Sequence, residues 1–154
     1  MKKTVKIKRN ELLHEISNLA YVIADVCEGK ESPHTLHQTF DICEAGNIDR
    51  VDSLITLAAA EAGAVMVPVA RLHIAAGNVT LSFPNLPKAR EMELAQLTRE
   101  YLVASVMHGY LSVTLPTSAP PWKIRRQEIF ASLQSAAAKA AGCRASLTRR
   151  LSPF

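Results

Sequence analysis

The spacing of apolar and polar positions predicts a mainly helical chain built around one central segment, 48–75. Apolar side chains recur there every three or four residues and so share one face of a helix. Asn47 or Asp49 is suited to cap its start, because either side chain can accept a backbone N–H. Between 62 and 70 the segment is apolar nearly all round, which predicts burial on several sides. The residues of the apolar face are Val51, Leu54, Ile55, Ala58, Ala62 and Val65.

Pro68 interrupts this segment. Because proline removes one helical hydrogen bond and clashes with the preceding turn, we expect a kink or break at 64–67. The helix is then expected to resume as far as about His73, with Gly77 marking its end.

The same periodicity predicts four more helices, at 11–28, 33–45, 88–110 and 122–141. Asn10 is a plausible cap for the first of them, and Gly142 is expected to end the last. The apolar stripe of the first helix is expected to dock on the central helix. The stripe is Leu12, Ile16, Leu19 and Ile23, and its expected partners are Leu54, Ala58 and Ala62.

Three short stretches alternate between apolar and polar residues, a pattern typical of strands. The first, 4–8, is either an edge strand protected by lysines or a disordered arm. The second, 78–83, precedes a proline turn, and the third is 111–115. We therefore predict a mainly α fold of four to five helices around the central helix, with a small β element. The predicted boundaries are 1–9 for the basic arm or edge strand, 10–142 for a single helical domain and 143–154 for a basic flexible tail.

Composition adds an expectation of self-association. The chain of 154 residues suits one domain, and 48% of it is apolar, but only 5% is aromatic. A core of Ala, Val, Leu and Ile buries little area per side chain, so we expect modest stability or burial shared with a second subunit. A ring or a smaller oligomer is the predicted form. The three cysteines form no CxxC pair, which argues against a disulfide framework.

No apolar region follows the basic start, and no run of about 18 uncharged apolar residues occurs. We therefore expect neither a signal peptide nor a membrane span. The expected location is the cytoplasm, or a virion if the protein assembles into one.

Charge is segregated along the chain. Residues 1–9 hold five basic groups, 10–100 hold six basic and thirteen acidic groups, and 101–154 hold seven basic groups and one acidic group. Such ends suit contacts with phosphates or with an acidic neighbour, and a merely solvated surface is the plain alternative. The candidate contact residues are Lys2, Lys3, Lys6, Lys8, Arg9, Lys123, Arg125, Arg126, Arg144, Arg149 and Arg150.

His34 and His37 have the only metal-like spacing, because residues three apart share a helix face. A third ligand is not evident, and two surface histidines are the favoured interpretation. Glu31, Asp41 or Cys43 would have to complete such a site.

The remaining histidines do not suggest catalysis. His14, beside Glu15, and His108 lack a serine or cysteine in a nucleophile turn, and no glycine-rich phosphate loop occurs. His108 falls in an apolar helix end, where a hydrogen-bonded core histidine is the commoner case. We predict a protein that is not an enzyme, with no cofactor.

Several segments resemble a group of uncharacterised prophage-encoded proteins of gut anaerobes. The segments are MKKTVKIKRNELLHEI, NIDRVDSLITLAAAEA, NVTLSFPNLP, REYLVASVMHGYL and TRRLSPF. The order of elements also resembles the small helical head–tail connector proteins of tailed phages, which assemble as rings between portal and tail. This resemblance implies a non-enzymatic structural or assembly protein of a phage or prophage particle, with other virion proteins as partners. The alternative is a small nucleic-acid-binding protein that uses its basic ends.

Overall fold

The computed structural model describes residues 2–26, 45–67 and 69–151, and side chains within 3–21, 47–67 and 69–142. The predicted helix at 33–45, with His34 and His37, lies outside these residues apart from its last position. Ile23 of the apolar stripe and Arg144, Arg149 and Arg150 of the tail have no described side chains.

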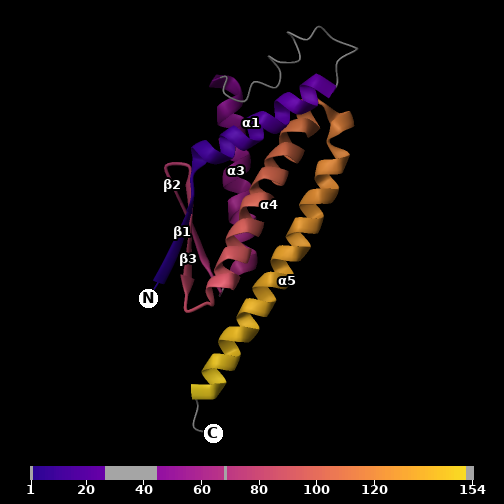
Figure 1. The fold of residues 1–154 in the computed structure, drawn as a ribbon. Coiled ribbons are helices and arrows are strands. Elements are labelled where there is room, and N and C mark those ends of the chain that lie inside the picture. The colour runs from indigo at the N-terminus through magenta and orange to yellow at the C-terminus, as the bar shows by residue number, and fades with distance from the viewer. Residues whose placement is uncertain (1, 27–44, 68, 152–154) are drawn as a thin grey trace.

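The described ranges contain four α-helices, one 3₁₀ turn and a three-stranded antiparallel sheet, so the prediction of a mainly α fold with a small β element is confirmed. Helices α3, α4 and α5 run side by side in alternating directions, α1 crosses one end, and the sheet lies on the side away from α5 (Figure 1). The elements are β1 Lys2–Ile7, α1 Arg9–Val26, α3 Ala45–Met66, β2 Arg71–Ala75, β3 Asn78–Pro84, α4 Lys88–Thr114, η1 Pro116–Ser118 and α5 Pro120–Leu151.

Helix α4, rather than the 48–75 segment, is the centre of the fold. Every residue from Tyr101 to Met107 is buried, and α4 packs against α1, α3 and α5. Gly109 brings α3 close, because a Cβ added there would lie 2.6 Å from Cδ2 of Leu54. The run YLVASVMHGYL is apolar on all sides, as a helix surrounded by partners requires.

Helix α1 packs mainly on α4, so its predicted docking on the central helix around Leu54, Ala58 and Ala62 is wrong. Leu12 and Ile16 are fully buried. Arg99 of α4 reinforces the contact, because its Nη2 lies 3.1 Å from Oε2 of Glu15 on α1. The start of α1 is held from outside the helix, since the Arg9 N–H donates to Oδ1 of Asn78 at 3.0 Å.

The predicted return of the helix after Pro68 is also wrong. Helix α3 ends at Met66, whose carbonyl accepts the N–H groups of Val69 and Ala70 at 2.7 and 2.9 Å. Strand β2 then begins at Arg71. The segment VPVARLHIA begins with four apolar residues, which make its strand pattern hard to recognise in the sequence. Only its second half alternates, since Leu72 and Ile74 are less exposed than their neighbours.

The sheet has the order β1-β3-β2, so β1 is an edge strand and the disordered arm is not adopted. Strands β2 and β3 form a hairpin whose two loop residues, Ala76 and Gly77, have φ angles of 51° and 77°. Two positive φ angles are the requirement of the tight turn that matches strand twist. Gly77 therefore closes a hairpin instead of a helix.

Two helices end later than predicted. Residues 111–115 form no strand, because α4 continues through Thr114. The Ser112 and Thr114 hydroxyls donate to the carbonyls of His108 and Tyr110 one turn earlier, so both polar side chains are satisfied within the helix. Gly142 does not end α5, which continues to Leu151 across the predicted boundary at 142/143. Its alanine-rich surroundings favour helix strongly enough to carry one glycine.

Candidate functional site

Three helices meet at one cluster of polar side chains, which we call the three-helix junction: Glu61 of α3, Tyr101 and Ser105 of α4, and Arg126 of α5. The Tyr101 hydroxyl donates to Oε2 of Glu61. Nη2 of Arg126 donates to the same carboxylate oxygen at 2.6 Å and to the Tyr101 oxygen at 3.1 Å. Nε of Arg126 donates to Oγ of Ser105 at 3.1 Å. Each of the three helices thus contributes at least one member to a connected hydrogen-bond network.

Aromatic contacts extend the junction. The guanidinium carbon of Arg126 lies 5.6 Å from the centre of the Tyr101 ring, and the Phe130 ring centre lies 5.5 Å from that of Tyr101. Tyr101 is 1% exposed, whereas the side chains of Arg126 and Glu61 are 32% and 44% exposed. A hollow of about 320 Å³ opens beside them, lined by Glu61, Tyr101, Arg126, Gln127, Phe130, Ala131 and Gln134.

The electrostatics of the junction favour a fixed, uncharged phenol. Burial raises the pKa of Tyr101, the hydrogen bond to Glu61 raises it further, and Arg126 lowers it in part. The pKa of His108, also on α4, is lowered by burial and then by the nearby charges of Arg126 and Lys123. Tyr101 is therefore a donor at neutral pH and His108 an uncharged imidazole. Because Glu61 and Arg126 are paired with each other, the junction ties the three helices together.

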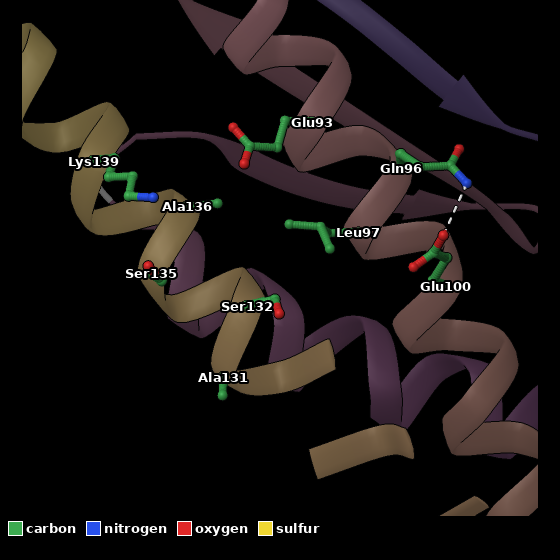
Figure 2. Close-up of a pocket in the computed structure, with 9 residues that line it drawn as sticks. All are labelled: Glu93, Gln96, Leu97, Glu100, Ala131, Ser132, Ser135, Ala136 and Lys139. Carbon is green, nitrogen blue, oxygen red and sulfur yellow. Dashed lines mark hydrogen bonds between the residues drawn. The ribbon is translucent and has the colours of Figure 1, made fainter. Parts of the chain in front are cut away.

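A second hollow, the α4–α5 groove, runs along the outer seam of these two helices (Figure 2). Its volume is about 630 Å³. Acidic side chains line the α4 side, where Glu100 accepts a hydrogen bond from Gln96 at 3.2 Å and Glu93 accepts one from Arg90 at 2.9 Å. Small side chains form most of the α5 side, and Lys139 stands at one end (Figure 2). The lining residues are Glu93, Gln96, Leu97, Glu100, Ala131, Ser132, Ser135, Ala136 and Lys139.

Two of the predicted contact cations are paired with carboxylates of the protein itself. Arg126 belongs to the three-helix junction. Arg9 forms a two-point ion pair with Asp52 of α3, at 2.8 Å from Nε and 2.6 Å from Nη2, and this hydrogen bonding raises the pKa of Arg9. Neither guanidinium is free to hold a phosphate.

The other predicted cations divide into paired and open groups. Lys3 lies 3.9 Å from the buried Glu91, and Lys8 lies 3.9 Å from Glu11, although both lysine side chains remain largely exposed. Within the described side chains, the exposed Lys6, Lys123 and Arg125 take part in no salt bridge or side-chain hydrogen bond. Lys2 lies in β1, and Arg144, Arg149 and Arg150 lie in α5.

These groups do not form one basic surface. Positions 123 and 149 are separated by about 39 Å along α5, at 1.5 Å per residue. His14 pairs with Asn18 at 3.3 Å on an exposed helix face. Among the residues with described side chains, no three of the His, Cys, Asp and Glu types gather closely enough to hold a metal ion.

The sequence analysis identified Arg126 as a candidate contact residue but none of its partners in the three-helix junction. Glu61 lies 40 residues from Tyr101 and 65 from Arg126, and no local spacing pairs such distant residues. The sequence analysis also did not identify Arg71 and His73 as exposed strand residues, because it assigned their segment to a helix.

The chain matches no protein-family model and shows no significant similarity to a curated protein or to a solved structure. In the part of the chain that is described, no helix is both long enough and apolar enough to cross a membrane.

Proposed function

We propose that this protein is a non-enzymatic assembly protein whose copies associate head to tail through α5. The observation that carries the proposal is the length of α5. It has 32 residues against 27 in α4, and its last turns extend beyond the first turn of α4 (Figure 1). The extending segment, 143–151, contains three arginines and no carboxylate.

The α4–α5 groove is the complementary surface for that segment. Glu93 and Glu100 are about 10 Å apart along α4 and share one side of that helix, at 1.5 Å per residue and 3.6 residues per turn. The arginines at 144, 149 and 150 span about 9 Å of α5 and are distributed around its circumference, so each side of the segment that could enter the groove lies near an arginine. Small side chains on the α5 side of the groove permit the interaxial approach of about 8–10 Å that packed helices need. A straight helix cannot turn back into its own groove, so the occupant is the end of another copy.

A contact between two different surfaces of the same chain is heterologous. It closes into a ring where the rotation between copies permits and otherwise grows into a filament. The resemblance to phage head–tail connectors supports the ring, and would make the assembly part of a phage or prophage particle with other virion proteins as partners.

A charge exchange tests the contact. The variant Glu93→Lys with Glu100→Lys, and separately the variant Arg149→Glu with Arg150→Glu, should each remain monomeric at concentrations where the wild type associates. Mixing the two variants should restore association, because each then offers the charge that the other lacks. Asp49→Lys, at an exposed carboxylate outside the groove lining, is the matched control and should associate like the wild type.

Light scattering at several protein concentrations and two salt concentrations gives the mass. Exposed charge pairs are screened by salt, so association should weaken at the higher one. A wild-type chain that stays monomeric at every concentration, or a mixture of the two variants that stays monomeric, contradicts the proposal.

A further inference from the structure

The sheet has one face on the helices and one face in solvent. Val79, Leu81 and Phe83 of β3 point inward and are fully buried. Lys3 of β1 pairs across the sheet with Phe83 and reaches Glu91 of α4, which fixes its position on the inner side. Because side chains alternate along a strand, the residues between these positions lie on the opposite face.

The strand register arranges that opposite face, the outer sheet face, in two rows. Thr4, Ser82 and Arg71 lie opposite one another in the first row, and Lys6, Thr80 and His73 in the second. Thr4, Lys6, Arg71 and His73 are exposed, and the two β3 hydroxyl residues are half-buried between them. With strands about 4.8 Å apart and two residues spanning about 6.7 Å, the six side chains cover an area of about 10 by 7 Å.

The chemistry of this face is uniformly suited to anions. The three strands contain no aspartate or glutamate. Among the described side chains, none of the six forms a salt bridge or a side-chain hydrogen bond. Two cations, an imidazole and three hydroxyls are therefore unpaired within the described structure and presented to solvent together.

The side chains of the outer sheet face indicate which class of anionic partner it suits. A protein interface needs an apolar centre, and a membrane-binding surface needs apolar side chains that enter the lipid. Only Ala75 represents apolar character among the exposed residues of β2 and β3. Lysine, arginine, serine and threonine are instead the usual donors to nucleic-acid phosphates. Phe83 points inward, so among the six residues of the face His73 alone has an aromatic ring, and successive bases have no row of rings on which to stack.

We infer that the outer sheet face binds the phosphate backbone of a nucleic acid, without reading its bases. Lys6 and Arg71 each neutralise a phosphate, and the hydroxyls of the middle strand donate between them. The face is complete in a single chain, so this inference does not rest on the proposed self-association. The sequence-based alternative placed nucleic-acid contacts at both basic ends. The inference places them on the sheet, where Lys6 of the basic start lies on the same face as Arg71.

Because only two phosphates are neutralised, the binding constant should depend modestly on the salt concentration. Each one contributes about −0.9 to the slope of log K against log salt on duplex DNA, so the expected slope is about −1.8. Affinity should then fall about twelvefold between 50 and 200 mM salt.

The experiment is fluorescence anisotropy with a labelled 24-base-pair duplex and a single strand of the same length. Protein is kept at concentrations where light scattering gives the monomer mass, so that multivalent binding by an oligomer does not contribute. In Lys6→Gln with Arg71→Gln, duplex affinity at 50 mM salt should fall at least tenfold and the salt slope should approach zero. Both replaced side chains are exposed, and an unchanged urea midpoint will show that the fold is intact.

The matched control is Lys123→Gln with Arg125→Gln, which removes the same charge from two exposed cations of α5. Its affinity and slope should equal those of the wild type, and Lys6→Arg should retain binding. Equal weakening in both double variants would assign the binding to net charge and overturn the inference. Tighter binding to vesicles containing phosphatidylserine than to either oligonucleotide, lost in the sheet variant alone, would overturn it in favour of a membrane surface.

Discussion

Replacing Tyr101 by phenylalanine removes one hydroxyl from the three-helix junction and leaves the ring in place. A hydrogen bond to a charged group contributes about 1.5–3 kcal/mol in proteins. Glu61 retains its bond to Arg126 and is 44% exposed, so the carboxylate is not left without a partner. We therefore expect the lower end of that range, about 1.5 kcal/mol lost at pH 7, which corresponds to about 3–6 °C in the melting temperature.

The pH dependence separates this bond from simple packing. The pKa of Tyr101 is higher in the folded chain than in the unfolded chain, where it is about 10. The folded state therefore retains the phenolic proton more strongly. The resulting stability is complete below pH 10 and is lost as the pH rises through the folded pKa. The wild type should lose stability at alkaline pH, and Tyr101→Phe should lose less because it has no phenol to ionise.

Urea unfolding followed by circular dichroism between pH 7 and 11 measures both effects. Glu61→Gln is the informative companion. Burial is the largest cause of the raised pKa of Tyr101, so this variant should keep most of the alkaline loss. The reasoning fails if Tyr101→Phe is as stable as the wild type at pH 7 and loses stability just as steeply above pH 10.

Four further substitutions test the packing, each by its urea unfolding midpoint. Ile16→Ala should lose about 2–4 kcal/mol from the fully buried contact of α1, and a wild-type midpoint would remove α1 from the core. Gly109→Ala should lose about 1–3 kcal/mol because Leu54 must move, whereas Gly142→Ala, with open space around it, should gain about 0.5–1 kcal/mol. Equal effects at these two glycines would contradict the close approach of α3. Gly77→Ala should lose at least about 1–2 kcal/mol, because its φ is positive and a Cβ would meet Arg9, and an unchanged midpoint would refute the hairpin geometry.

The elements that sequence analysis predicted well are those whose pattern is local. The stripe in α1 and the alternation in β3 each depend on residues within one element, and both are confirmed where side chains are described, which for α1 covers Leu12, Ile16 and Leu19. Strand β2 was missed because the apolar residues on both sides of Pro68 fit a helix equally well, and only pairing with β3 decides between them. Gly142 was read as a stop signal, but a glycine ends a helix only where the backbone adopts a left-handed conformation.

The candidate site was much less predictable than the fold. The bonds that make the three-helix junction join residues 21 to 65 positions apart, and nothing in the sequence near Arg126 distinguishes it from the open Arg125. The outer sheet face needed the register of three strands before its rows became visible. Lys6 was identified as a candidate from charge alone, whereas Arg71 and His73 became candidates only once β2 was known to be a strand.

The sheet order β1-β3-β2 also determines the order in which the strands can pair during synthesis. Among the described strands β1 pairs with β3 alone, which follows it by about 70 residues, whereas β2 and β3 are joined by a two-residue turn. At the usual rate of about 5–20 residues per second, β1 waits about 4–15 s for β3 to leave the ribosome. Its lysines discourage pairing with other chains during that delay, as charged residues do on exposed edges. The hairpin is therefore expected to form first, and β1 to complete the sheet by adding to the free side of β3.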